Sequence, residues 1–341
     1  MFPVQNPGCC LIAEIGVNHG GDLVLAKEMV MAAKRVGADA VKFQTFSAAR
    51  LVNPGTPKVK YQESTTSPKE THYDMIRSLE LSLEDHRALF DFCRYEAIEF
   101  ISTPYDVESA RFLDELGCLA FKTASADIVD LDLHRFLAST GKPVLISTGM
   151  ASLGEIEECL HVYGNRTRKD LVLLHCVSNY PCSDASLNLR VLPMLAAAFG
   201  CRVGFSDHSV GSEAAMVSVA LGAIVIEKHF TTDRALPGPD HAASVLPEEF
   251  AQLVSAVRRV ELMLGSAIKE LQPEEAQMAS VSRKSITLVK ALVPGEALSR
   301  EHVTLKRPGT GLLARELPAL LGRKARYALP VGRQLRHSDL E

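Results

Sequence analysis

Two histidines follow neighbouring apolar segments of the sequence. His208 comes shortly after the run at 201–205, and His229 closes the run that begins at 223, with a helix-like stretch at 211–221 between them. This order is typical of a parallel βαβ unit, in which reactive side chains gather where the strands end. Two imidazoles on adjacent strands can bind one divalent metal and leave its other positions open to water and substrate. The pair lacks a third protein ligand, so two packing histidines are the alternative.

Two lysines end other apolar runs, Lys42 in AVKFQTF and Lys122 in FKTASAD. Buried cations of like sign are costly unless an anion accompanies them. Together with nearby hydroxyl groups, they predict a site for a phosphate, a carboxylate or both. Glu14 and Asp240 are the candidates for proton transfer or for binding a sugar hydroxyl. The hydroxyl donors expected here are Thr103, Ser125, Ser147 and Ser206.

Eight apolar runs alternate with longer amphipathic segments between residue 9 and about residue 265. Eight βα units in succession predict a closed (β/α)8 TIM barrel, an α/β fold whose active sites lie at the carboxyl ends of the strands. Glycines at 37, 117 and 222 stand where a helix should end and the next strand begin. The runs expected to be strands are 10–15, 38–43, 98–102, 119–123, 143–147, 171–177, 202–205 and 223–228.

The alternation of side chains along a strand gives every predicted strand a polar group at the same rim of the barrel. The segment 51–78, with prolines at 54, 57 and 68, is predicted to be a long polar loop after the second strand. Loops of this length in compact domains are usually functional lids or disordered.

The pattern changes after residue 264. Residues 1–265 are therefore assigned to the barrel and the polar stretch 266–283 to a linker. Residues 284–341 contain short alternating stretches separated by Pro-Gly and Gly turns, which predict a small, mostly β domain.

Composition excludes several classes of protein. The chain is 47% hydrophobic and 23% charged with a net charge of −4, which is typical of a soluble globular protein and gives no sign of a nucleic-acid or anionic-membrane surface. The eight cysteines are scattered without a CxxC pair, which favours buried free thiols. The amino terminus resembles neither a signal peptide nor a membrane span, so a cytoplasmic protein is expected.

Ten motifs are spread along the chain: IAEIGVNHGG (12–21), AVKFQTF (40–46), ISTPYD (101–106), FKTASAD (121–127), ISTGM (146–150), LLHCVSNYP (173–181), GFSDHSVG (204–211), EKHFT (227–231), PGPDH (237–241) and LKRPGTG (305–311). In this order they resemble the sialic acid synthase family. The likeness covers essentially the whole chain and implies that the carboxyl-terminal domain is an antifreeze-like (β-clip) domain.

The resemblance implies a metal-dependent condensation of phosphoenolpyruvate with an acetamido sugar. The product is a nine-carbon 2-keto-3-deoxy acid, and phosphate is released. N-acetylmannosamine is the acceptor in the type case, and a diacetamido-trideoxyhexose leading to legionaminic or pseudaminic acid is the alternative. By position, His208 and His229 would hold Mn²⁺, with Mg²⁺ or Co²⁺ as other candidates. Phosphoenolpyruvate would be held by Lys42, Thr103, Lys122, Ser125, Ser147 and Ser206.

A second set matches family positions on the sugar side. The resemblance implies that Arg307 reaches the acetamido group in the partner subunit's site, which makes a domain-swapped homodimer the expected assembly. Asp127 stands where the family has a glutamate, and Ser178 stands where it has an asparagine. The acceptor is therefore less defined than the phosphoenolpyruvate side. The sugar-side residues are Gln44, Tyr105, Asp127, Tyr180, Asp240 and Arg307.

Two rival functions remain on sequence grounds. A 3-deoxy-heptulosonate or octulosonate phosphate synthase shares the barrel and phosphoenolpyruvate, but it needs a second phosphate site, and no further arginine-rich strand end is present. A sugar-binding protein that has lost the chemistry would keep the fold, although no metal or lysine position is replaced here.

Overall fold

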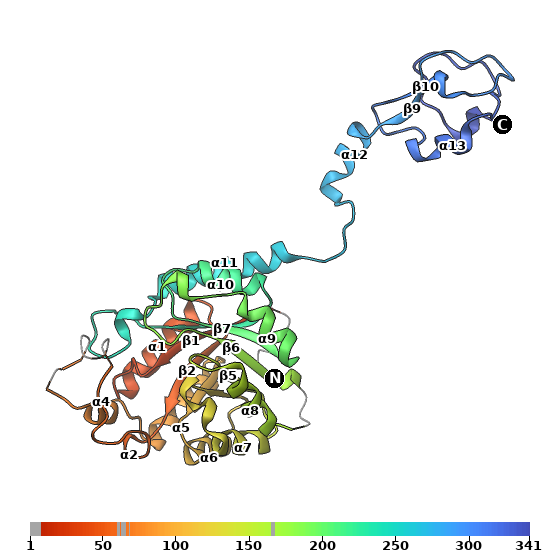
Figure 1. Ribbon diagram of the computed structural model, residues 1–341. Helices are drawn as coiled ribbons and strands as arrows, with labels where there is room; N and C mark the ends of the chain where they lie inside the picture. Colours follow the sequence, from red (N-terminus) through yellow and green to blue (C-terminus); the bar gives the residue numbers. More distant parts are fainter. Residues whose placement is uncertain (1–7, 60–61, 63–65, 68, 165–167) are drawn as a thin grey trace. The chain divides into compact units, whose positions relative to one another are not determined.

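The computed structural model describes residues 8–59, 62, 66–67, 69–164 and 168–341, and the chain divides into two compact units, 1–265 and 266–341 (Figure 1). In the first unit eight parallel strands follow one another in the order β3-β2-β1-β8-β7-β6-β5-β4. β3 and β4, at the ends of this order, also lie next to each other, so the sheet closes into the predicted barrel. The strands are β1 Cys10–Gly16, β2 Ala40–Thr45, β3 Glu99–Pro104, β4 Phe121–Thr123, β5 Val144–Ser147, β6 Leu171–His175, β7 Arg202–Asp207 and β8 Ala223–His229.

Helices lie around the outside of this sheet (Figure 1). Their apolar faces and the outer faces of the strands share one large core, whereas a smaller cluster that includes Ile12, Leu174 and Val225 fills the barrel interior. The helices are α1 Leu23–Arg35, α2 Ala48–Leu51, α4 His72–Ser78, α5 Leu83–Tyr95, α6 Val107–Leu116, α7 Leu131–Ser139, α8 Leu153–Val162, α9 Val191–Phe199, α10 Glu213–Ala220 and α11 Pro247–Leu264.

Local sequence signals fix where these elements begin and end. Ser82 and Ser152 form capping boxes at the starts of α5 and α8, each accepting a backbone N–H and paired with an acidic residue three positions on. The glycines predicted to end helices at 37, 117 and 222 have φ of 89°, 94° and 100°, a region that side chains with a Cβ rarely adopt. The predicted boundaries between helix and strand at these three glycines are thereby confirmed.

The long segment after β2 is more ordered than the sequence predicted. Its described part contains α2 and α4, and the Thr71 capping box starts α4. The N–H of Ala48, at the start of α2, donates to the Glu80 carboxylate just after α4. This contact joins the two ends of the segment to each other.

The second unit has its own apolar core, which includes Ile286, Leu298 and Leu335. Its antiparallel sheet pairs β9 Ser285–Leu288 with β10 Val303–Lys306, and α13 Leu317–Leu320 packs beside a set of isolated bridges. The stretch predicted to be a linker contains a helix, α12 Ala276–Ser282, and the Gly309 N–H donates to the Ser280 carbonyl at 2.7 Å. The second half of that stretch therefore packs with the carboxyl-terminal unit.

All eight cysteines are buried thiols outside any disulfide, as predicted. In the part of the chain that the structure describes, we find no helix that combines the length and the apolarity needed to cross a bilayer.

Gly204 in β7 provides a test of the barrel interior. A Cβ at this position would lie 2.8 Å from the Val225 carbonyl oxygen and 2.5 Å from Leu174 Cδ2. We expect Gly204→Ala to lower the free energy of unfolding by about 1–3 kcal/mol because the packed interior must shift. Urea unfolding followed by circular dichroism measures the change.

Gly154→Ala is the matched control. Gly154 lies in α8, where an added Cβ meets no atom closer than 4.0 Å. It should leave stability unchanged or raise it slightly, because alanine favours helix. Equal stability of the two variants would contradict the proposed packing at Gly204.

Candidate active site

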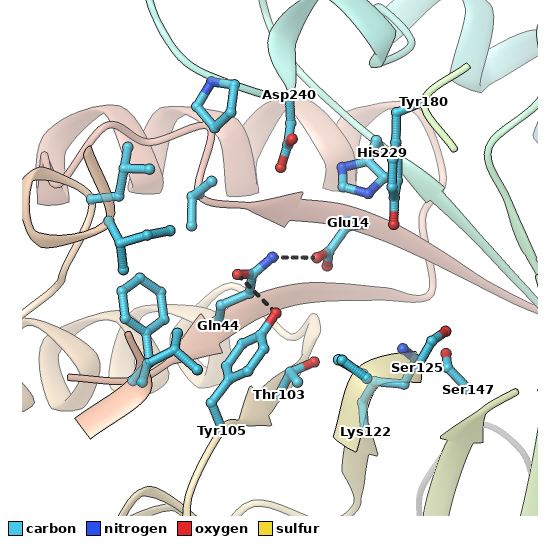
Figure 2. Close-up of a pocket in the computed structure, with 18 of the residues that line it drawn as sticks. Glu14, Gln44, Thr103, Tyr105, Lys122, Ser125, Ser147, Tyr180, His229 and Asp240 are labelled. Carbon is cyan, nitrogen blue, oxygen red and sulfur yellow. Dashed lines mark hydrogen bonds between the residues drawn. The ribbon is translucent and has the colours of Figure 1, made fainter. Parts of the chain in front are cut away.

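A cavity of about 490 Å³ opens at the carboxyl ends of the barrel strands. Each of the eight strands, or the residues just after it, contributes a side chain to its wall. Figure 2 shows that these side chains point toward a common space. The sequence-predicted residues that line the cavity are Glu14, Lys42, Gln44, Thr103, Tyr105, Lys122, Ser125, Ser147, Tyr180, Ser206, His208, His229 and Asp240.

At the base of the cavity lies a buried group of two lysines and two glutamates. Lys42 Nζ lies 2.8 Å from Glu14 Oε1 and 3.8 Å from Glu227 Oε2. Lys122 Nζ lies 3.6 Å from Glu227 Oε1. Glu227 also accepts a hydrogen bond from the Ser206 hydroxyl at 2.9 Å, and Lys42 donates to Thr103 Oγ1 at 3.2 Å. The protein thus supplies its own anions to both buried cations.

Sequence reasoning placed Glu227 at the inner rim by strand alternation but gave it no role in the site. It stands two residues before His229 in EKH, so both side chains face the barrel interior from one strand. That shared parity was the available signal. Its importance comes from its position between the two lysines, which depends on the closed barrel placing β8 across the mouth from β2 and β4.

The charges in this group shift the pKa of each member. Burial raises the pKa of Glu14, and the nearby ammonium of Lys42 only partly offsets this. Burial also acts to raise the pKa of Glu227, but Lys122 and Lys42 outweigh it, so the pKa of Glu227 is lowered. Burial lowers the pKa of Lys122. Glu227 is therefore the stable anion of the group, and Glu14 is the carboxyl that can hold a proton near neutral pH.

Hydroxyl groups surround Lys122 on the other side of the cavity. Figure 2 shows Ser125 and Ser147 close to Lys122, on the side away from Gln44. The Gly149 N–H donates to Ser125 Oγ at 3.1 Å, and a Cβ at Gly149 would lie only 2.7 Å from that oxygen. This close approach holds the loops after β4 and β5 together. The result is a small polar pocket around one ammonium group.

His208 and His229 meet as the sequence predicted. Their ring centroids lie 5.6 Å apart, and the Tyr180 ring lies 4.1 Å from that of His208. His208 Nδ1 donates to the Val177 carbonyl at 2.7 Å, so Nε2 carries the lone pair, and the Ser206 hydroxyl oxygen lies 3.3 Å from Nε2. Burial lowers the pKa of both histidines, so both are neutral at physiological pH and able to act as ligands.

A chain of polar contacts leads away from the charged group. Gln44 Nε2 donates to Glu14 Oε1 at 3.4 Å, and the Tyr105 hydroxyl donates to Gln44 Oε1 at 3.2 Å (Figure 2). Asp240 lies above Glu14 in the same view, and burial raises its pKa to about 6. These groups can bind several hydroxyl or amide groups of a polar ligand.

Two predicted sugar residues do not line the cavity. Asp127 is the one predicted barrel residue that does not line the cavity. The short turn Ser125–Val129 directs Ser125 into the cavity and leaves Asp127 beside Asp130. Arg307 belongs to the second unit, where it is exposed just after β10. Its assignment to a partner's site stays a prediction.

Residues between 51 and 79 line part of the cavity, a position that a lid would also take. Sequence reasoning had assigned His72 to the surface or to packing and had not singled out the others. Gln62 and His72 are polar members of this wall, and His72 Nδ1 is buried without a hydrogen-bond partner. The apolar members include Leu51, Ile76 and Leu79.

Comparison with known proteins identifies the family. The family model described as the NeuB family matches residues 29–269, and the SAF domain model matches residues 283–341. The chain belongs to the NeuB family. The expected barrel followed by an antifreeze-like domain is confirmed, and at family level so is the class of enzyme that condenses phosphoenolpyruvate with a sugar.

Three proteins illustrate the range of this similarity. N,N'-diacetyllegionaminic acid synthase of Legionella pneumophila is 44% identical over 98% of this chain and 95% of its own length. Pseudaminic acid synthase of Helicobacter pylori is 33% identical over 97% of each chain. The crystal structure of the N-acetylneuraminic acid synthetase of Leptospira borgpetersenii is 34% identical, covers 80% of this chain and 90% of its own, and has a TM-score of 0.70.

Glu227→Gln tests the role of the buried carboxylate. It should lower the midpoint of thermal unfolding, because removing one partner from a buried charge group typically costs about 3–5 kcal/mol. Added inorganic phosphate should stabilise the variant more than the wild type, since it replaces a missing negative charge beside Lys122. Differential scanning fluorimetry with and without phosphate measures both effects.

Glu301→Gln serves as the control, because Glu301 pairs with Lys290 on the exposed surface of the second unit. It should leave both quantities unchanged. If Glu227→Gln behaves like this control, the carboxylate does not stabilise the lysines.

Proposed function

We propose that the protein condenses phosphoenolpyruvate with a diacetamido-trideoxyhexose, as a synthase of the legionaminic or pseudaminic acid type. The observation that carries this choice is the 44% identity, over nearly the full length, to a diacetyllegionaminic acid synthase. Identity falls to 34% for a sialic acid synthetase and to 33% for a pseudaminic acid synthase, so the legionaminic type is the better supported of the two diacetamido types. The diacetamido alternative is therefore better supported than N-acetylmannosamine, which the sequence motifs alone had favoured.

The base of the cavity suits phosphoenolpyruvate. Its phosphate and carboxylate need cations and hydroxyl donors, and Lys42, Lys122, Thr103, Ser125, Ser147 and Ser206 all line the same cavity. Both ammonium groups are buried, so their attraction for an anion is weakly screened by water. Glu227 keeps them charged and oriented before the substrate enters.

Glu14 is suited to hold and deliver a proton. In the condensation, C3 of phosphoenolpyruvate bonds to the carbonyl carbon of the acceptor, and the carbonyl oxygen takes up a proton. Water then adds at C2, and phosphate leaves by C–O cleavage. The raised pKa of Glu14 lets its carboxyl carry that proton near neutral pH. Its Oε2 atom is buried and has no hydrogen-bond partner, so it is available to a ligand.

His208 and His229 fit a divalent metal. His208 presents its Nε2 lone pair, and the Nδ1 of His229 is buried without a hydrogen-bond partner. We propose these two histidines as the protein ligands. Within the described ranges no group of three or more His, Cys, Asp or Glu side chains is arranged for a metal. A bound Mn²⁺ would polarise the acceptor carbonyl, and Mg²⁺ or Co²⁺ could supply the same chemistry.

The carboxyl-terminal unit is proposed to complete a partner's site. The support is the SAF domain match over 283–341 and the exposure of Arg307 within the KRPGTG motif. A guanidinium group suits the carbonyl oxygen of an acetamido group, and a covering domain would exclude water from the reaction. The assembly proposed is therefore a domain-swapped homodimer.

An acceptor screen tests the proposed function. With phosphoenolpyruvate and Mn²⁺, we expect phosphate release with a diacetamido-trideoxyhexose at a higher kcat/KM than with N-acetylmannosamine. Mass spectrometry should identify a nine-carbon diacetamido acid. Preference for N-acetylmannosamine would return the assignment to a sialic acid synthase, and turnover only with a sugar phosphate would refute both.

Metal binding can be measured without turnover. His208→Ala and His229→Ala should each weaken Mn²⁺ binding in calorimetric titration by at least about tenfold, as expected when one of few ligands is lost. Exposed His161, in α8, provides the control, and His161→Ala should bind Mn²⁺ as the wild type does. Unchanged affinity in both site variants would remove the metal from this pair of histidines.

A further inference from the structure

One side of the cavity is mostly apolar, although Thr56, Gln62 and His72 also line it. Val17, Phe46, Leu51, Val52, Ile76 and Leu79 all line it and come from the β1–α1 turn and the segment between β2 and α5. Most of them form one packed cluster with Met75 and Tyr105. We call these six residues the apolar wall. A polar sugar gains nothing from such a surface unless part of the sugar is itself apolar.

The apolar wall lies at a defined place relative to the reacting groups. Along β2 the alternate side chains Lys42, Gln44 and Phe46 face the cavity, and each step of two residues advances about 7 Å toward the rim. Tyr105 connects the two regions, since its hydroxyl donates to Gln44 and its ring meets Phe46 edge-on at 5.9 Å. From the base of the cavity to the apolar wall, the side chains are therefore first charged, then amide and phenol, and finally hydrocarbon.

This order gives a direction to the acceptor sugar. Its reacting carbonyl must lie near Glu14 and the two histidines, and the pocket around Lys122, Ser125 and Ser147 is taken by phosphoenolpyruvate. The rest of the sugar then extends past Gln44 and Tyr105. Figure 2 shows unlabelled hydrocarbon side chains gathered on that side of Gln44, away from Lys122. The end of the sugar farthest from its carbonyl meets the apolar wall.

Contacts between neighbouring segments hold the apolar wall in position. A Cβ at Gly21 would lie 2.7 Å from the Ser78 carbonyl oxygen, so the β1–α1 turn packs directly against the end of α4. Glu80 accepts the N–H of Ala48 at the start of α2, and His86 Nε2 contacts the Gln44 carbonyl at 3.3 Å. These contacts fix Leu51, Ile76 and Leu79 before any ligand binds.

We propose that the apolar wall binds the terminal methyl group of the acceptor and selects a 6-deoxy sugar over one with a hydroxyl at carbon 6. This inference rests on the proposed function, in which the acceptor is a trideoxyhexose. A methyl group against the wall gains the free energy of leaving water. A hydroxyl in the same place loses its hydrogen bonds to water and finds hydrocarbon instead.

His72 offers a competing interaction, with a hydroxyl group at carbon 6. Its Nδ1 atom lacks a partner and its side chain lines the same cavity, so it could receive a terminal hydroxyl. In that case the enzyme would prefer the 6-hydroxy sugar, and His72→Phe would abolish the preference. Recognition by the apolar wall and recognition by His72 therefore predict opposite preferences between the 6-deoxy and the 6-hydroxy sugar.

The test uses two diacetamido hexoses that differ only in carrying hydrogen or a hydroxyl at carbon 6. For the wild type we expect kcat/KM to favour the 6-deoxy sugar by about 10- to 100-fold, the range that an apolar pocket achieves against an added hydroxyl. Ile76→Thr places a hydroxyl in the wall and should reduce the ratio at least several-fold, mainly through KM. Ile76→Val keeps the wall apolar and should keep the ratio.

A wild-type ratio of one or less overturns the inference, as does a ratio that Ile76→Thr leaves unchanged. Failure of the proposed function has a different signature, because neither diacetamido sugar would then react while N-acetylmannosamine does. In that event N-acetylmannosamine and its 6-deoxy form provide the same comparison, and their ratio decides the inference by the same criterion.

Discussion

The site is organised around a buried group of two ammonium and two carboxylate side chains. Lys42 lies 2.8 Å from Glu14, and Glu227 lies within 4 Å of both Lys42 and Lys122. Burying four charges is unfavourable unless each is closely compensated. The barrel meets this condition by bringing β1, β2, β4 and β8 to one mouth. Because the lysines are compensated internally, they stay charged in a place where an anionic substrate can later exchange partners with them.

The same arrangement separates the tasks of the two carboxyl groups. Glu227 has a lowered pKa and anchors the lysines, whereas Glu14 has a raised pKa and keeps an unpaired oxygen. Two residues of similar chemistry thus differ because Glu227 lies within 4 Å of two ammonium groups, whereas Glu14 lies that close to one. The neutral histidines beside them complete the proposed site for an anion, a proton and a metal ion.

The surface proposed to determine specificity lies outside the barrel strands. The segment between β2 and α5 carries most of the apolar wall and is held by Gly21, Glu80 and His86. Barrel enzymes commonly change substrates through such loops while keeping their strands. Family members whose names state different product acids are consistent with this separation of strands and loops.

The sequence by itself determined the barrel, the carboxyl-terminal domain, and which side chains stand at the strand ends. Alternation along each strand and glycine at helix ends are local properties, so Lys42, Lys122, His208 and His229 could be placed at one rim without coordinates. What only the tertiary structure decided is proximity across strands. Glu227 is a partner of both lysines because β8 lies close enough across the barrel mouth. Asp127 is directed out of the cavity by the 125–129 turn. The apolar wall forms from segments that are far apart in the sequence. Such contacts depend on how strands close and loops pack, which residue spacing along one chain does not encode.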